Sequence, residues 1–208
     1  MNKLIIIILC IFNISVSAQE ELAKDILEKL KLATESYKNI TTEFIFVFEN
    51  TSQKIKEQQE GNLIVEQEKF RLEMNGQTII NDGETQWVYL NDLNEVQIME
   101  NDPEDETMSP NRLLTIYEEK YKYNYVESIS EDGKRLHIID FFPKERQEFI
   151  KINIAVNALK NQLDKIILYD KNGGTYTYSI TSFIINKNDK PFTFNITDST
   201  NIEIIDLR

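Results

Sequence analysis

The chain has 208 residues, of which 41% are hydrophobic, 28% charged and 10% aromatic, and its formal net charge is −12. This length and this hydrophobic content suit one domain with a sizeable core and exclude a disordered or collagen-like chain. The acidity argues against nucleic acids and anionic membrane surfaces as partners, and a single histidine excludes a zinc site built from several histidines.

The first 18 residues have the pattern of a secretory signal peptide. Lys3 supplies a basic start, residues 4–12 are an unbroken apolar run, and Ala18 ends a small-residue stretch suited to cleavage before Gln19. A membrane anchor is the alternative, but this run is far shorter than the roughly 20 residues that span a bilayer. The sequence therefore predicts signal-peptide residues 1–18 and one exported domain over 19–208. Because Cys10 is lost, that domain has no disulfide and no thiol nucleophile.

The exported domain begins with an amphipathic helix followed by closely spaced strands. Apolar residues recur at helical spacing from Leu22 to Tyr37. Strand patterns follow at residues 44–48, 61–65, 70–74, 77–80, 86–90 and 95–99. The turns between them, such as Asn75-Gly76, are too short for parallel crossovers, so these strands are expected to be antiparallel neighbours.

An acidic loop over 101–109 and a short helix over 110–120 interrupt the strands, with Ser109 as helix cap and Pro110 at the first helical position. Strand patterns resume at residues 121–130, 134–142, 149–157, 162–169, 175–185 and 192–195. We therefore expect a mainly β (α+β) fold with two helices and about eleven strands in one antiparallel sheet. A sheet this large curls, and a curled sheet has a concave face.

The sequence lacks the patterns of catalysis. His137 is the one imidazole and lies within a strand pattern, which favours a structural role, and no phosphate-binding or dinucleotide-binding glycine motif occurs. The acidic loop lacks the alternating ligand spacing of a calcium loop. We expect no enzyme activity, no metal and no cofactor.

The apolar strands carry the functional signal. In residues 44–48 neither alternating set of side chains is polar, so both faces of that strand must be covered. A second protein layer or a hydrophobic ligand would each do this, but two helices are too few to cover so wide a sheet. Which set faces a ligand, Phe44, Phe46 and Phe48 or Ile45 and Val47, stays open.

Several segments, in order and spacing, resemble the LolA family of periplasmic outer-membrane lipoprotein carriers. These are Phe44, residues 61–65, 70–74 and 79–89, the Ser109-Pro110-Asn111-Arg112-Leu113-Leu114 segment, Phe192-Thr193-Phe194 and residues 204–208. The resemblance implies an unclosed β-barrel with a lid helix over a hydrophobic cavity. It also implies a periplasmic monomer that takes acylated lipoproteins from an inner-membrane lipoprotein-releasing ABC transporter to an outer-membrane acceptor.

On this reading the acyl chains would contact an apolar lining rather than directed hydrogen-bond donors. The expected lining residues are Phe44, Phe46, Phe48, Leu72, Met74, Trp87, Tyr89 and, on the lid helix, Leu113, Leu114 and Tyr117.

One position departs from the family pattern. Gln67-Glu68 stands where the family's well-known carrier has an Arg-Pro pair whose arginine helps to hold the lid closed, and Arg71 has the wrong strand parity to replace it. Control of the lid is therefore expected to differ here. A LolA-fold lipid or glycolipid sensor of the cell envelope, which would use the same cavity, is a second reading. An exported hydrolase that uses His137 or a pair of acidic residues in a cleft is a third.

Overall fold

A computed structural model describes residues 2–101, 121–146, 148–187, 190–195 and 202–208, with the backbone alone for 2–18. The helix α1 (Asn2–Glu35) leads into the first strand series: β1 (Ile40–Asn50), β2 (Ile55–Glu66), β3 (Lys69–Met74), β4 (Gln77–Asn81), β5 (Thr85–Leu90) and β6 (Glu95–Glu100). The second series is β7 (Tyr121–Glu131), β8 (Lys134–Pro143), β9 (Phe149–Asn157), β10 (Gln162–Asp170) and β11 (Gly174–Ile185), followed by β12 (Glu203–Asp206).

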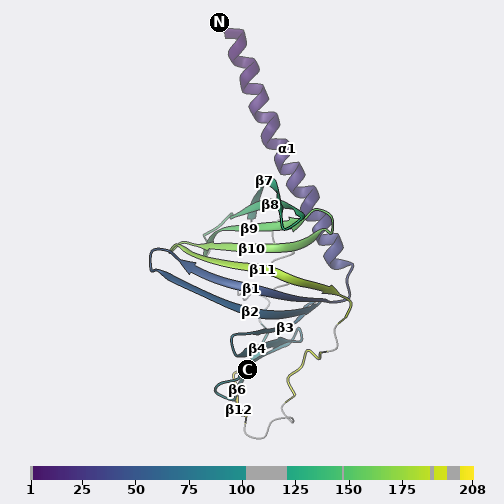
Figure 1. Cartoon of the computed structure of the whole chain (residues 1–208), viewed down its shortest axis with the longest axis vertical. Coiled ribbons are helices and arrows are strands. Elements are labelled where there is room, and N and C mark those ends of the chain that lie inside the picture. The colour runs from purple at the N-terminus through teal and green to yellow at the C-terminus, as the bar shows by residue number, and fades with distance from the viewer. Residues whose placement is uncertain (1, 102–120, 147, 188–189, 196–201) are drawn as a thin grey trace.

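The described strands form a single sheet in the order β12-β6-β5-β4-β3-β2-β1-β11-β10-β9-β8-β7 (Figure 1). All neighbouring pairs are antiparallel except β12 on β6, which is parallel. Strands β7 and β12 stand at opposite ends of this order, so the sheet curls without closing. The expectation of a curled, unclosed and mainly antiparallel sheet is confirmed, with twelve strands among the described residues.

Turn chemistry sets much of this topology. Asn75 and Gly76 both have positive φ (54° and 71°) between β3 and β4, as do Asp132 and Gly133 (50° and 74°) between β7 and β8. Two left-handed residues in a two-residue loop match the twist of antiparallel strands, which is why Asn-Gly and Asp-Gly favour hairpins. Both turns were expected from the sequence.

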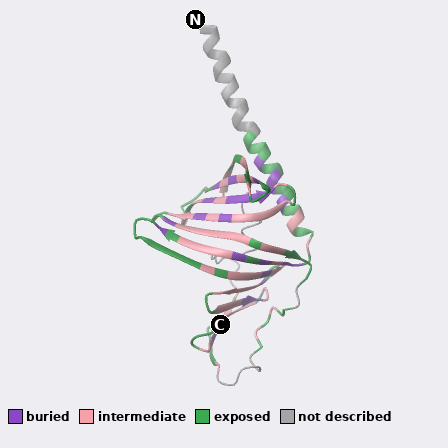
Figure 2. Ribbon diagram, viewed as in Figure 1, coloured by how far each residue is buried: buried purple, intermediate pink, exposed green. Residues whose placement is uncertain are grey.

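The main core lies between α1 and the second strand series. The buried stripe of α1 consists of Ala23, Ile26, Leu27 and Leu30. It forms one cluster with β8, β9 and β10 side chains that include Ile139, Phe141, Ile152, Ile154, Ile166 and Leu168. Burying each of the larger aliphatic side chains contributes about 1.5–3 kcal/mol. Figure 2 shows the buried residues concentrated where α1 meets these strands. We call the side of the sheet that carries this cluster the helix face and the opposite side the outer face.

One expectation about the helices lies outside the description, and one about the last strand is contradicted. The predicted helix over 110–120 lies outside the described residues. The strand predicted at 192–195 is wrong, because residues 190–195 have no strand conformation and the last strand is Glu203–Asp206. Pro191 cannot donate a backbone hydrogen bond to a ladder, which disfavours a strand at that point.

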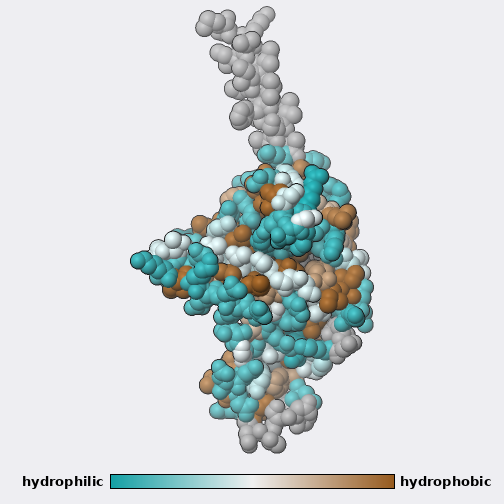
Figure 3. All heavy atoms as spheres, viewed as in Figure 1, coloured by the Kyte–Doolittle hydropathy of each residue, from teal (hydrophilic) through white to brown (hydrophobic). Residues whose placement is uncertain are grey.

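The face of the molecule shown in Figure 3 is mostly hydrophilic, with hydrophobic side chains scattered among polar ones. Part of the polar surface consists of ion pairs between strands, such as Lys165 with Glu131 at 2.8 Å and Lys134 with Asp164 at 2.6 Å. Both pairs are partly exposed, so each adds little stability. Among the residues with a described conformation, no helix is both long and apolar enough to cross a membrane.

Candidate functional site

Strands β1 and β11 pair where the two strand series meet, and we call this pairing the seam. It carries a row of aromatic side chains on the helix face. Pairing of β1 with β11 sets Phe48 opposite Tyr176 and Phe46 opposite Tyr178. Because directly paired residues point to the same side of a sheet, these four rings share one face. Tyr176 and Tyr178 pack against the α1 core cluster, which identifies that face as the helix face. Ile45 and Val47 therefore point to the outer face.

The rings contact one another along the row. The centroid distance is 4.9 Å between Phe48 and Tyr176, 5.0 Å between Phe46 and Tyr178, and 5.7 Å between Phe44 and Tyr178. These are tilted aromatic pairs within the favourable range of 4.5–7 Å. Phe44 is buried, whereas Phe46, Phe48 and both tyrosines are only partly buried. Phe44 is thus the buried inner end of the row, and the apolar surface becomes more accessible toward Phe48.

Gly61 makes room for the inner end of the row. It lies opposite Phe44 across the β1–β2 pair, and a Cβ atom added at Gly61 would run into the tip of the Phe44 ring. The phenylalanine ring thus covers the backbone of the neighbouring strand. A glycine in a strand often marks such a close approach.

The apolar surface of the helix face continues onto β3. Pairing of β2 with β3 sets Met74 opposite Gly61 and Leu72 opposite Leu63, so both β3 residues lie on the same face as Phe44. Leu72 and Met74 are partly buried. In the part of the chain that the structure describes, α1 is the one helix, and its core lies over β8 to β10 rather than over β3.

Trp87 and Tyr89 do not join this surface. The register across β3, β4 and β5 sets Trp87 in line with Ile80 and Arg71, which have the opposite parity from Leu72. The expected lining residues of β5 are therefore on the outer face. Leu113, Leu114 and Tyr117 fall outside the described residues. Phe44, Phe46, Phe48, Leu72 and Met74 are the members of the expected set that one face brings together.

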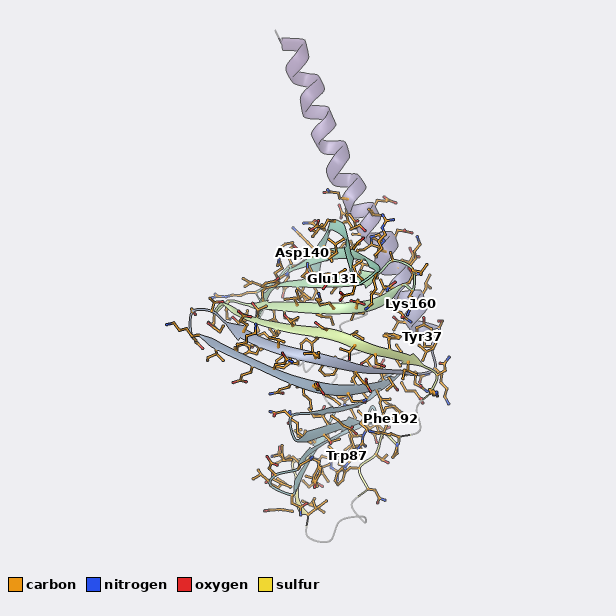
Figure 4. The ribbon with its side chains drawn as sticks, in the orientation of Figure 1. Tyr37, Trp87, Glu131, Asp140, Lys160 and Phe192 are labelled. Atoms are coloured by element: carbon orange, nitrogen blue, oxygen red, sulfur yellow. The ribbon has the colours of Figure 1, made fainter. Side chains whose placement is uncertain are left out.

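A C-terminal strap, residues 190–195, lies against the outer face near Trp87 and Tyr89. Phe194 packs on the Tyr89 ring at 5.3 Å, and the Lys190 ammonium lies 2.9 Å from the Glu73 carboxylate of β3. Figure 4 labels Trp87 and Phe192 at this end of the sheet. Beneath this part of the outer face Ile80 and Val96 are 1% and 0% exposed. The strap thus covers part of the outer face at Tyr89 and Glu73.

The strap also explains what Arg71 does. Arg71 Nε lies 2.7 Å from Glu73 Oε1, the carboxylate that Lys190 also contacts. Burial by itself would raise the pKa of Glu73, but the hydrogen bonds and charges of Lys190 and Arg71 hold that pKa below its ordinary value. Arg71 thus forms its ion pair on the outer face, away from the aromatic row. Gln67, in the β2–β3 turn, has a left-handed φ of 54°.

The electrostatics of the aromatic row favour neutral tyrosines. Burial, followed by the charge and hydrogen bond of Asp170 and the charge of Glu148, raises the pKa of Tyr176. Burial also raises the pKa of Tyr178. Neutral phenols and phenyl rings make an adaptable apolar surface rather than a reactive one.

His137 and the acidic side chains are the residues that the sequence offers for catalysis or metal binding. His137 has its Nδ1 atom 3.5 Å from the Tyr125 hydroxyl, a contact at the limit of a hydrogen bond. Burial and the charges of Arg135 and Lys29 lower the pKa of His137. In the same described ranges no three His, Cys, Asp or Glu side chains gather into a possible metal site.

Sequence reasoning missed Tyr176 and Tyr178 as members of this surface. Their alternation with Thr175, Thr177 and Ser179 is a clear period-2 signal in the sequence. What the sequence does not show is that β11 pairs with β1, more than a hundred residues earlier.

Comparison with known proteins agrees with this architecture. The family described as "Outer membrane lipoprotein carrier protein LolA" matches residues 35–197. A search of curated proteins finds no match. Among solved structures, an uncharacterized conserved protein from Thermus thermophilus is similar with a TM-score of 0.55 at 10% identity, covering 88% of this chain and 98% of the other.

Two further structures have lower TM-scores. A LolA superfamily protein from Nitrosomonas europaea has a TM-score of 0.44 at 13% identity and covers 83% of this chain and 97% of its own. MucB in the Pseudomonas aeruginosa MucA/MucB complex has a TM-score of 0.42 at 14% identity, covering 82% of this chain and 61% of the other.

Proposed function

Because the chain belongs to the LolA family, whose members are periplasmic and share a binding and carrier fold rather than an enzymatic one, we propose that it is a periplasmic carrier of lipoproteins. In this proposal the helix face holds the acyl chains of the cargo. The observation that carries the proposal is the partly buried apolar surface of Phe46, Phe48, Leu72 and Met74, which continues from the core beyond α1.

The energetics fit a binding surface of this kind. Each CH₂ group that moves from lipid into water costs about 0.8 kcal/mol, so one ordinary acyl chain of about 16 carbons costs roughly 12 kcal/mol. Apolar side chains replace much of that loss without requiring one fixed pose. A carrier must also release its cargo, and a surface without directed hydrogen bonds suits that need.

The remaining parts of the proposal follow the family pattern. Residues 1–18 act as a signal peptide, and Leu113, Leu114 and Tyr117 belong to a lid over the acyl chains. The partners are acylated lipoproteins, an inner-membrane lipoprotein-releasing ABC transporter and an outer-membrane acceptor, and the carrier works as a monomer. The chain is acidic, with a formal net charge of −12 over its full length, so it would be repelled by anionic membranes and stay between them.

The test compares two neighbouring residues of β1 that point to opposite faces. The protein is purified from an exporting host, extracted with organic solvent and analysed for bound lipid or lipoprotein by mass spectrometry. Phe46→Ser is expected to remove most of the bound lipid, whereas Val47→Ser, on the outer face, is expected to leave it unchanged. Absence of lipid from the unmodified protein, or equal loss in both variants, would contradict the proposal.

A lipid-binding sensor is the second candidate, and the Gln67-Glu68 departure from the Arg-Pro pattern favours it. The two functions differ in what a deletion does. Loss of a carrier mislocalises lipoproteins, whereas loss of a sensor changes an envelope stress response while lipoproteins still reach the outer membrane. Leu114→Glu should block lipid loading at the lid under either function. It therefore tests the shared binding site but does not distinguish a carrier from a sensor.

A further inference from the structure

An acidic–aromatic corner, formed by Phe48, Phe149, Asp170 and Tyr176, closes one end of the aromatic row. Tyr176 is at its centre, with Phe48 at 4.9 Å on β1 and Phe149 at 5.7 Å on β9. Because β11 and β10 lie between β1 and β9 in the sheet, these two rings flank Tyr176 from opposite sides. The Phe149 ring is almost perpendicular to that of Tyr176, at 83°.

Asp170 brings a carboxylate to these rings. Its Oδ1 accepts hydrogen bonds from the backbone N–H groups of Asn172 (2.6 Å) and Gly174 (2.8 Å), which fix the side chain in the β10–β11 turn. Its Oδ2 has one long hydrogen bond, 3.4 Å from the Tyr176 hydroxyl. A Cβ atom at Gly174 would meet both this carboxylate and the Phe48 ring, so glycine lets the two lie close together.

Among the described residues, no cation forms an ion pair with the carboxylate of this corner. Among the ion pairs between described residues, none includes Asp170, although Lys165 and Lys151 lie on the outer face of nearby strands and are paired there. Glu148, next to Phe149 in the chain, adds to the same negative field, which contributes to the raised pKa of Tyr176. Aromatic faces beside a carboxylate form the usual recognition site for organic ammonium groups.

We propose that this corner binds the ammonium head of an amphiphile whose acyl chain lies along the aromatic row. The inference rests on the proposed function, because it adds a headgroup site to the same face. The apolar row and the corner are continuous through Phe48, which contacts Tyr176, while Tyr176 also contacts Phe46 at 6.4 Å. A ligand that is apolar along its length and cationic at one end matches that order.

The test uses three detergents with the same dodecyl chain: dodecyltrimethylammonium, dodecyl maltoside and dodecyl sulfate, each titrated below its micelle concentration by calorimetry. The cationic probe is expected to bind about five- to tenfold more tightly than the neutral one, in line with a partly desolvated cation–π contact. Asp170→Asn keeps the turn-capping oxygen but removes the charge, and Phe48→Leu removes a ring. Both are expected to reduce the preference to about twofold or less.

The matched control is Asp82→Asn. Asp82 Oδ1 accepts the backbone N–H groups of Glu84 (3.0 Å) and Thr85 (2.8 Å) in the β4–β5 turn, so it has the same local role and the same charge far from the corner. This variant is expected to keep the full preference. Circular dichroism melts verify that every variant folds.

The outcomes separate this inference from the function on which it rests. Equal binding of all three detergents would overturn the proposed ammonium site but leave the proposed carrier function standing. Equal loss of preference in Asp82→Asn would overturn it too, since net charge alone would then explain the effect. Binding of a short lysine-rich peptide without an acyl chain, as tightly as the cationic detergent, would overturn the amphiphile assignment. Binding of no detergent would overturn both proposals.

Discussion

Replacing Gly61 with alanine tests the packing at the inner end of the aromatic row. The backbone at Gly61 does not have a positive φ, so alanine brings no backbone strain there and should by itself stabilise the fold by about 0.4–1 kcal/mol. Its methyl group would, however, meet the Phe44 ring, which is 7% exposed and packed on Tyr178 at 5.7 Å. Overpacking of this kind costs about 1–3 kcal/mol. We therefore expect a net loss of about 0.5–2 kcal/mol.

The assay is urea unfolding followed by circular dichroism, in a double-mutant cycle with Phe44→Leu. Leucine ends short of the position of the ring tip, so Gly61→Ala should become neutral or stabilising in that background. The expected coupling free energy is about 1–2 kcal/mol, in the range seen for residues in contact. Additive effects, or a Gly61→Ala variant as stable as the unmodified protein, would refute the reasoning.

Three further predictions concern the strap and the single imidazole. Phe194→Ala removes a partly buried ring from Tyr89 and should lower the free energy of unfolding by about 1–2 kcal/mol, measured by urea titration; no change would show that the strap adds no stability. Because the folded state lowers the pKa of Glu73, its ion pairs stabilise the fold above about pH 4.5 and are lost as the pH falls through the lowered pKa; Lys190→Ala should weaken this loss in melts between about pH 3 and pH 6. The pKa of His137 is also lowered, so the unfolded chain binds this proton more readily. Stability should therefore decline as the pH falls below about 6.5, and less steeply in His137→Gln.

The sequence is sufficient for the strands and hairpins of the fold because these depend on local patterns. Asn75-Gly76 and Asp132-Gly133 specify tight turns, and period-2 alternation marks most of the strands. The buried stripe of α1 likewise follows from helical spacing. These features need no information from distant parts of the chain.

The faces of the sheet were harder to predict because several strands are apolar on both sides. Trp87 and Val88 are neighbours on opposite faces of β5, and only the register across β3 and β4 decides which of them shares a face with Leu72. The partner that covers Tyr89 is Phe194, about a hundred residues later, in a segment without regular secondary structure. Local periodicity contains no signal for such a contact.

The pairing of β1 with β11 has a consequence for folding. Strands β1 to β6 and β7 to β11 are two meanders that can each form from neighbouring segments, but the seam joins residues as far apart as Ile40 and Ile185. Closing a loop of that size costs roughly 4 kcal/mol of chain entropy, so the seam is expected to be slow to form. Phe46 and Phe48 come from one meander and Tyr176 and Tyr178 from the other. The surface proposed to hold acyl chains thus comes into being with the completed fold, and a half-folded chain has no site with which to capture cargo.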